Sequence, residues 1–206
     1  MNPSKEPFVV GALHCQAAVF CYKADGTVDD LEADLNTMTG NLGHVRGEVH
    51  HEKARFLEAV EAWNKQCAPD GAFLCVYAHA GAPGIAPIGG EEFVSNPNRD
   101  SLLVTWGELA QALPCGVAYL WLLGCCTEQA LKKWEPIRSP VLRRLLATNA
   151  KFPWQPFVKW FASEIGLDPI MYNDQMVPLL LQKAPELAAQ TQYFGADLKP
   201  VAPSPI

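Results

Sequence analysis

The sequence predicts an α/β domain with a mostly parallel central sheet. Two short apolar runs, residues 72–78 (AFLCVYA) and 117–123 (VAYLWLL), are bounded by Gly or Pro and contain β-branched and aromatic side chains. This pattern is typical of strands that are buried on both faces. An amphipathic segment precedes each run, and the order strand–helix–strand indicates βαβ units with right-handed crossovers. At 206 residues, 49% apolar and 18% charged, the chain is long enough for one globular domain of this kind.

The first elements of the chain carry weaker signals. Residues 7–22 are apolar with small side chains and fit one strand or a hairpin. A short helix is predicted over 27–35, where Val28, Leu31 and Leu35 recur at helical spacing behind Thr or Asp capping residues. A strand followed by a helix is the beginning expected of an α/β domain.

The next segment contains the clearest helix. Polar residues 36–47, which include three glycines, are typical of a loop. Residues 49–66 follow, with Phe56, Val60 and Trp63 on one face and charged residues opposite. This helix would connect the first strand region to the buried strand at 72–78.

In the second half of the chain, glycine, proline and helix-capping residues mark where the elements begin and end. The Gly- and Pro-rich stretch after the 72–78 strand fits a hairpin or loop at the edge of the sheet. Thr105 and Glu108 stand in the relation of a capping box, which predicts a helix ending near Pro114. Later helices are expected at 128–134, at 157–165 and within 176–191, with Pro185 kinking or splitting the last. Residues 141–148 fit a strand or a helix.

The aromatic residues gather late in the chain. Residues 152–161 contain Trp154 and Trp160 together with three phenylalanines. Buried helix packing explains such a cluster, and an exposed docking patch is the alternative.

Charge and hydropathy exclude several classes of partner. The net charge is −6, and no run of Lys or Arg exceeds two residues, which argues against nucleic acid or an anionic membrane as a partner. The longest apolar run is well below the roughly 18 residues that a membrane-spanning helix needs. The N-terminus lacks a clear cleavage site, so no signal peptide is expected.

The cysteines indicate a reducing compartment. There are seven of them, an odd number, without CxxC spacing, and several lie inside apolar runs where a thiol acts as a small hydrophobic side chain. The pattern fits the cytoplasm better than a disulfide framework. Most of these thiols are expected to be core residues. The seven positions are Cys15, Cys21, Cys67, Cys75, Cys115, Cys125 and Cys126.

A candidate site lies where the two buried strands end. The 72–78 strand is followed by His79, and the 117–123 strand by Gly124, Cys125 and Cys126. Functional groups collect at the carboxyl ends of parallel strands, so an imidazole and a thiol would meet there. Thr127 and Glu128 then open the predicted 128–134 helix, whose N-terminus would favour a thiolate. We therefore expect a base–nucleophile pair.

Metal and cofactor sites are not expected. His44, His50 and His51 cluster in sequence, but adjacent histidines point apart on a helix and no cysteine pair completes a ligand set. Exposed histidines around a helix start are the preferred interpretation. The glycines within 81–90 lack the Lys-Ser/Thr sequel of a phosphate loop.

Five consecutive segments resemble the caspase-fold cysteine peptidases, and among them the bacterial CHAT-type proteins. In that family an amphipathic helix, a strand ending in His-Gly, a Gly-rich hairpin, a Thr-x-x-x-Leu helix and a strand ending in Ser-Ala-Cys-Glu-Ser follow one another. The corresponding segments here are ARFLEAVEAWNKQ, FLCVYAHAG, GIAPIGGEEF, TWGELAQAL and YLWLLGCCTE. The resemblance covers roughly residues 55–128.

The resemblance implies a single caspase-like three-layer α/β/α domain over residues 1–198, with 199–206 as a disordered tail. It implies a cysteine endopeptidase, a hydrolase in which Cys126 is the nucleophile and His79 the general base. Cys125 would be the small residue before the nucleophile, although a one-residue slip would exchange the two. The backbone N–H groups of Ala80 and of the nucleophile would form the oxyanion hole. Ala80 stands where the family usually has glycine.

The resemblance also implies partners. The substrate would be a protein or peptide, and a regulatory protein partner or self-cleavage would activate the enzyme, in a bacterial stress or phage-defence setting. An acidic pocket would select Arg or Lys beside the cleaved bond and an arginine-lined pocket Asp, but the spacing selects no residue. The acidic candidates are Asp25, Glu91, Glu92, Asp100 and Glu128.

Two alternatives stay open. The first is a catalytically inactive caspase-fold interaction module, which Ala80 favours because an alanine replaces the usual glycine. The second is a flavodoxin-like or Rossmann-like enzyme whose ligand lies at the same strand ends.

Overall fold

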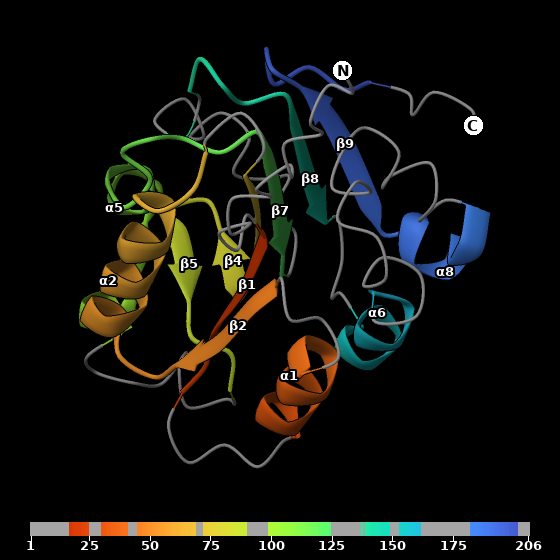
Figure 1. Ribbon diagram of the computed structural model, residues 1–206, viewed down its shortest axis with the longest axis horizontal. Coiled ribbons are helices and arrows are strands. Elements are labelled where there is room, and N and C mark those ends of the chain that lie inside the picture. Colours follow the sequence, from red (N-terminus) through yellow and green to blue (C-terminus); the bar gives the residue numbers. More distant parts are fainter. Residues whose placement is uncertain are drawn as a thin grey trace, which may run out of the picture.

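The computed structural model contains a six-stranded central sheet within its described residues (Figure 1). The order of the strands is β2-β1-β3-β7-β8-β9, and all neighbours are parallel except β9, which runs antiparallel to β8. The strands are β1 (Ala17–Tyr22), β2 (Val45–His50), β3 (Phe73–Tyr77), β7 (Tyr119–Leu123), β8 (Arg144–Thr148) and β9 (Thr191–Gly195). The structure describes residues 17–24, 30–40, 45–68, 72–89, 99–124, 137, 139–148, 153–161 and 182–201.

Helices cover both faces of the sheet, as Figure 1 shows. Successive strand residues alternate between the two faces, so Val19 and Cys21 belong to one core cluster and Phe20 and Tyr22 to the other. This arrangement confirms the predicted three-layer α/β/α architecture with a mostly parallel sheet. One face packs against α1 (Leu31–Gly40), α6 (Trp154–Trp160) and α8 (Pro185–Ala188), and the other against α2 (Lys53–Asn64) and α5 (Trp106–Gln111).

The order of the parallel strands creates a switch point between β1 and β3. From β1 the chain passes to β2 on one side, and then crosses back so that β3 lies on the other side of β1. In open α/β sheets, ligands bind in the crevice at the carboxyl ends of the strands beside such a reversal. Flavodoxin-like sheets share this parallel order, so topology alone leaves that alternative open.

A small second sheet lies between β3 and β7 in the chain. It consists of β4 (His79–Gly81), β5 (Gly84–Ala86) and β6 (Val104–Thr105), all antiparallel. The hairpin predicted after the 72–78 strand is therefore confirmed. Its first residue is His79, so the hairpin fixes the backbone of the candidate base. The short helix α4 (Arg99–Leu102) precedes β6.

The capping box predicted at Thr105 is confirmed. The Thr105 Oγ1 accepts a hydrogen bond from the Glu108 backbone N–H at 3.2 Å, and the Glu108 carboxylate accepts one from the Thr105 N–H at 2.8 Å. Lys53 of α2 also pairs with the Glu108 carboxylate at 2.6 Å. The two helices on this face are thereby joined at their N-terminal ends.

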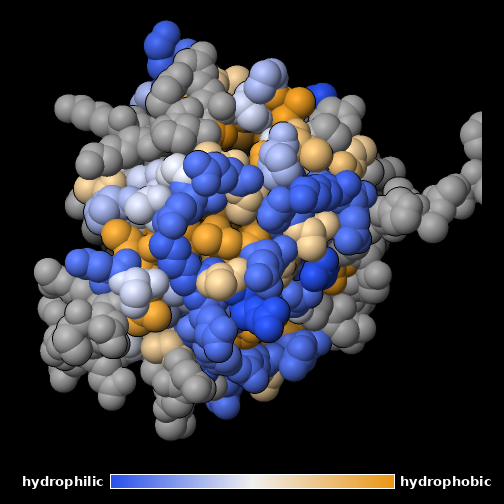
Figure 2. Space-filling view, turned by 90° about the vertical axis from the view of Figure 1, so that its left-hand side faces the viewer, coloured by the Kyte–Doolittle hydropathy of each residue, from blue (hydrophilic) through white to orange (hydrophobic). Residues whose placement is uncertain are grey.

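The exposed side of these helices is polar. Figure 2 shows the face that carries α2 and α5, and it is largely hydrophilic. Exposed ion pairs on α2 join Arg55 to Glu58 at 3.1 Å and Lys65 to Glu61 at 2.5 Å. Such pairs contribute little to stability, and they mark a solvated surface.

The aromatic residues of 153–161 are buried, which confirms the interpretation as helix packing within this range. Trp154 and Trp160 are 8% and 6% exposed, and Phe157 is fully buried. The ring of Trp160 stacks on Trp121 of β7 with centroids 6.2 Å apart. These side chains fill the space between α6 and the sheet.

The predicted loop over 36–47 was wrong at both ends. Helix α1 continues to Gly40, and β2 begins at Val45. The predicted 49–66 helix begins only at Lys53, because residues 49 and 50 belong to β2. Strand β2 is an edge strand whose residues after Val45 are only half buried. An edge strand of this kind lacks the continuous apolar run that reveals a central strand.

The C-terminal prediction was also wrong in part. The helix expected within 176–191 is split at Pro185: residues 182 and 183 are helical, Ala184 is not, and Pro185 begins α8, a position that proline tolerates. The edge strand β9 follows at once and was not foreseen. The ambiguous segment 141–148 contains strand β8, and the helix predicted at 128–134 lies outside the described residues.

The chain continues to pair along β9 after residue 198. The Gly195 N–H donates to the Lys199 carbonyl, and the Val201 N–H donates to the Tyr193 carbonyl, both at 2.9 Å. The boundary between domain and tail stays a prediction for residues 202–206, which lie outside the described residues. In the part of the chain that the structure describes, no helix is long and apolar enough to cross a membrane.

Candidate functional site

The two strands that carry the candidate residues are neighbours and end together. Tyr77, the last residue of β3, is opposite Leu123, the last residue of β7. The Ala78 N–H donates to the Leu123 carbonyl at 3.1 Å, so the pairing continues one residue beyond β3. His79 and Gly124, the residues after these strand ends, therefore lie at the same carboxyl edge of the sheet.

Gly124 lies against the residues on either side of His79, the carbonyl of Ala78 and the side chain of Ala80. A Cβ at Gly124 would be 2.3 Å from the Ala78 carbonyl oxygen and 3.1 Å from the Ala80 Cβ. Only glycine fits such a close approach between two segments of the chain. Cys125 and Cys126 follow Gly124 directly in the sequence. Cys125 and Cys126 themselves lie outside the described residues.

Thr148 holds the peptide groups of Gly124. Its hydroxyl, at the end of β8, accepts a hydrogen bond from the Gly124 N–H at 3.3 Å and donates one to the Gly124 carbonyl. Thr148 is fully buried. One side chain thus satisfies a donor and an acceptor of the same residue, and fixes the direction in which the chain leaves β7. The apolar pattern around residue 148 gave no sign of this role.

The other described cysteines cannot pair with His79. Cys21 and Cys75 are fully buried within β1 and β3, and burial raises the pKa of the Cys75 thiol. Cys67 precedes β3 and Cys115 precedes β7, so both lie at the amino edge of the sheet. Cys15, outside the described residues, also precedes its strand in the chain. The chain places only Cys125 and Cys126 directly after a strand that neighbours β3.

Ala80 occupies ordinary strand backbone. It pairs with Ile85 in the β4–β5 hairpin, and Leu198 is the only described residue other than glycine with a positive φ. The Ala80 side chain is half buried and packs against the core cluster on the α2 side. An alanine in place of the usual glycine therefore requires no backbone strain here.

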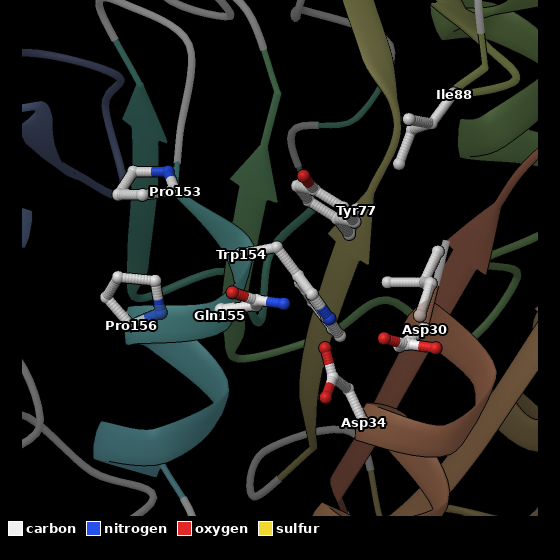
Figure 3. A pocket seen from close by; sticks show the side chains of 9 residues that line it. Asp30, Asp34, Tyr77, Ile88, Pro153, Trp154, Gln155 and Pro156 are labelled. Atoms are coloured by element: carbon white, nitrogen blue, oxygen red, sulfur yellow. The ribbon is translucent and has the colours of Figure 1, made fainter. Parts of the chain in front are cut away.

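A pocket of about 330 Å³ opens at the same edge, at the switch point between β1 and β3 (Figure 3). Its aromatic wall is formed by Tyr77 of β3 and Trp154 of α6, whose rings stack with centroids 4.4 Å apart. Asp30, directly before α1, and Asp34, in its first turn, also line the pocket, and the Asp34 carboxylate lies beside the indole of Trp154 in Figure 3. Leu31 and Ile88 add apolar surface.

The acidic residues of this pocket were missed by the sequence analysis. Of the five carboxylates considered there, only Asp100 is described, and it lies on α4. The signal that could have found the pair is the four-residue spacing of Asp30 and Asp34. That spacing puts both on one face of a helix, next to the inward-facing Leu31 and Leu35.

The histidine cluster is at the end of the edge strand β2. His50 Nε2 lies 2.9 Å from a Glu48 carboxylate oxygen, and His51 Nε2 lies 3.3 Å from one of Glu32. Burial lowers the pKa of His50 despite the neighbouring Glu48. The prediction that His50 and His51 lie on a helix was wrong. Among the described residues no group of His, Cys, Asp or Glu could hold a metal ion, and His44 is not among them.

Comparison with known proteins identifies no family for this chain. No family model matches the chain, and no curated protein matches it. One similar solved structure is that of a secreted C11 cysteine protease from Bacteroides thetaiotaomicron, iotapain, with a TM-score of 0.48 and 9% sequence identity. The alignment covers 88% of this chain and 66% of the protease, so this chain spans slightly less than two thirds of that protein.

Proposed function

We propose that this chain is a cysteine endopeptidase in which His79 and Cys126 form the catalytic pair. The observation that carries the proposal is the contact of Gly124 with the residues on both sides of His79. In the sequence, the cysteine pair begins at the residue after Gly124. A histidine that neighbours a cysteine favours the thiolate, which is the reactive form.

The proposed reaction has two steps. The Cys126 thiolate attacks the peptide carbonyl carbon, and the tetrahedral intermediate collapses as the C–N bond breaks. The His79 imidazolium gives its proton to the leaving amine, which leaves a thioester and a neutral imidazole. A water molecule then attacks the thioester while His79 takes one of its protons. The C–S bond breaks, the thiolate returns and the carboxylic acid leaves.

The backbone N–H groups of Ala80 and Cys126 are proposed to stabilise the oxyanion of both intermediates. Support for this role comes from the regular hairpin that fixes the backbone of Ala80. Fixed donors of this kind contribute without reorganising during the reaction.

We also propose that the enzyme is of the CHAT type and works in the cytoplasm of a bacterium. It would act in stress or phage defence after activation by a protein partner or by self-cleavage. The inactive interaction module was favoured by Ala80 alone. Because Ala80 lies in unstrained strand backbone, its backbone conformation gives no support to the inactive form.

The proposal is tested by covalent labelling of the full chain with peptide chloromethyl ketones that differ in the last residue. Labelling should occur in the wild type and in Cys125→Ala, and should be lost in Cys126→Ala. The two substitutions are matched because they remove the same thiol from adjacent positions. His79→Ala should also abolish labelling, since the thiolate loses its partner.

Two outcomes would contradict the proposal. Equal labelling of Cys125→Ala and Cys126→Ala would show that neither thiol is specifically activated. Labelling of the wild type at Cys67 or Cys115, with none at the pair, would place the reactive thiol at the wrong edge of the sheet.

A further inference from the structure

One edge of the central sheet presents free backbone groups. Strand β2 pairs with β1 along one side, in an unbroken parallel register over all six of its residues. The His50 carbonyl accepts a hydrogen bond from the Lys23 N–H at 3.0 Å, so the peptide groups of His50 point toward β1. This direction alternates along a strand, and the peptide groups of Val45, Gly47 and Val49 therefore point away from the sheet. Among the described residues, none forms a backbone hydrogen bond to them on that side.

This edge lacks the common protection against pairing with a further strand. Natural proteins protect exposed edges with proline, with lysine or with a β-bulge. The sequence of β2, VRGEVH, contains neither proline nor lysine, and its register with β1 has no bulge. Its Arg and Glu side chains have opposite charges and pair with each other, with Arg46 Nε 2.6 Å from Glu48 Oε1. The edge is therefore open to a strand of matching sequence.

The sequence of β2 matches itself when it is reversed. In an antiparallel pair of two copies centred on Gly47, Val45 is opposite Val49 and Arg46 is opposite Glu48. The residues whose peptide groups point outward then oppose one another, so each such pair exchanges two backbone hydrogen bonds. Arg46 and Glu48 fall at the positions between these pairs, where opposite side chains are closest. Opposite charges stabilise a pair at such positions, and like charges destabilise it.

The charges select this register over its neighbours. A shift of two residues in one direction would place Arg46 opposite Arg46 of the second copy, and a shift in the other direction would place Glu48 opposite Glu48. Both shifts bring like charges together, which costs stability. A shift of one residue would set outward-pointing peptide groups against inward-pointing ones, and the ladder of hydrogen bonds would be lost. The strand therefore specifies a single antiparallel register with its own copy.

A hollow beside the edge leaves room for the second copy. A pocket of about 400 Å³ lies between β2 and α1, which are neighbours in Figure 1. Its walls include Gly47 and Val49 from the strand and Leu35 and Asn36 from the helix. Val49 is half buried and packs against the core cluster that contains Val45. Val45 of a second copy would lie in this hollow against Val49, and apolar contact would add to the hydrogen bonds.

We propose that two copies of this chain form a symmetric dimer through β2, in antiparallel pairing centred on Gly47. The two six-stranded sheets become one continuous sheet, and both copies use the same surface, as a twofold axis requires. This axis reverses the direction of the strands. The carboxyl edges of the two sheets, where the candidate sites lie, are therefore on opposite sides of the dimer. The assembly does not depend on the proposed peptidase function.

The mass of the full chain in solution tests the dimer. In sedimentation equilibrium from about 1 to about 300 μM, the mass of the wild type should rise from 22.6 kDa toward twice that value. Gly47→Pro removes the central outward-pointing N–H and leaves the hydrogen bonds to β1 in place, a position where edge strands tolerate proline. It should weaken association at least about tenfold, because the centre of the ladder is lost. Urea titration checks that the variant is folded.

Charge reversal distinguishes pairing between copies from the ion pair within one copy. Arg46→Glu makes both charges on the edge negative, and Glu48→Arg makes both positive, so each variant alone should associate at least about tenfold more weakly than the wild type. A mixture of the two variants should dimerise within about threefold of the wild-type affinity, because the acidic edge of one chain then opposes the basic edge of the other.

Glu186→Arg is the matched control for Glu48→Arg. It makes the same change of charge on α8, which packs beside β9 at the opposite edge of the sheet. Association of this variant should equal that of the wild type. A loss as large as that of Glu48→Arg would show that net charge, and not pairing along β2, governs the association.

Three further results would overturn the proposal. A wild type that stays at 22.6 kDa up to about 300 μM forms no such dimer. A dimer that survives in folded Gly47→Pro uses another surface. A mixture of the two charge variants that stays monomeric would show that the charges act only within one copy. If Gly47→Pro does not fold, the mixture decides, because Arg46 and Glu48 are about one third exposed and tolerate exchange. None of these results bears on labelling at Cys126.

Discussion

At the scale of single residues, Thr148 is the side chain on which the candidate site most depends. Thr148→Val keeps the shape and removes the hydroxyl that serves both the N–H and the carbonyl of Gly124. Two buried backbone groups then lose their partner, which should cost about 1–3 kcal/mol of unfolding free energy. The hydroxyl also fixes the direction in which the chain leaves β7. Its removal should therefore lower the rate of labelling by a peptide chloromethyl ketone.

Thr191→Val is the control for Thr148→Val. The Thr191 hydroxyl donates to the Ala188 carbonyl at 2.9 Å, at the start of β9 and away from Gly124. This variant should lose some stability in urea without a change in labelling rate. A Thr148→Val protein that labels as fast as the wild type would show that Thr148 is only a core residue.

His50 predicts a pH dependence of stability. Burial lowers its pKa in the folded state, while Glu48 opposes this shift and Arg46 and His51 add to it. The unfolded chain then binds more protons than the folded chain between the lowered pKa and about 6.5. Unfolding free energy should therefore fall as the pH drops below about 6.5, and this part of the loss should be absent in His50→Gln. Urea titrations at pH 7.5 and 5.5 measure the difference, and identical pH slopes in the two proteins would contradict it.

At the scale of elements, the contact between the end of β7 and the β3–β4 junction predicts the effect of one methyl group. Gly124→Ala would put a Cβ 2.3 Å from the Ala78 carbonyl oxygen, so the two segments of the chain must move apart. We expect a loss of about 1–3 kcal/mol in unfolding free energy, as for other overpacked sites, and loss of peptide labelling.

Gly81→Ala is the matched control for Gly124→Ala. A Cβ at Gly81 would meet the Pro83 Cδ at 3.7 Å, an ordinary contact, two residues from His79 on the same hairpin. This variant should remain stable and reactive. If Gly124→Ala were equally stable and reactive, the close approach of the two chains would not be a requirement of the site.

The elements also show what sequence reasoning can reach. The central strands β3 and β7 were predicted because burial on both faces demands a continuous apolar run, and the α5 cap because Thr105 and Glu108 have a specific spacing. The edge strands β2 and β9 were not predicted, because half-buried strands mix polar and apolar residues. Their pairing depends on neighbours that are distant in sequence, which a local pattern does not contain.

At the scale of the whole molecule, the sheet determines which residues meet. The sequence placed His79 and the cysteine pair at two strand ends, and the parallel register of β3 and β7 brings those ends together. The acidic pocket could not be foreseen, because Tyr77 ends β3 whereas Asp30 follows β1 and Trp154 follows β8. Only the strand order brings their elements to one edge, and that order was not predicted.

The pairing of His79 with Cys126 is tested most directly by the pH dependence of thiol alkylation. The full chain is treated with iodoacetamide over a range of pH, and the modified cysteines are mapped by mass spectrometry in the wild type and in His79→Gln. We predict that Cys126 reacts with an apparent pKa below the ordinary thiol value of about 8.5, and that His79→Gln raises it toward that value. Ordinary titration of both Cys125 and Cys126, unchanged by His79→Gln, would contradict the pairing.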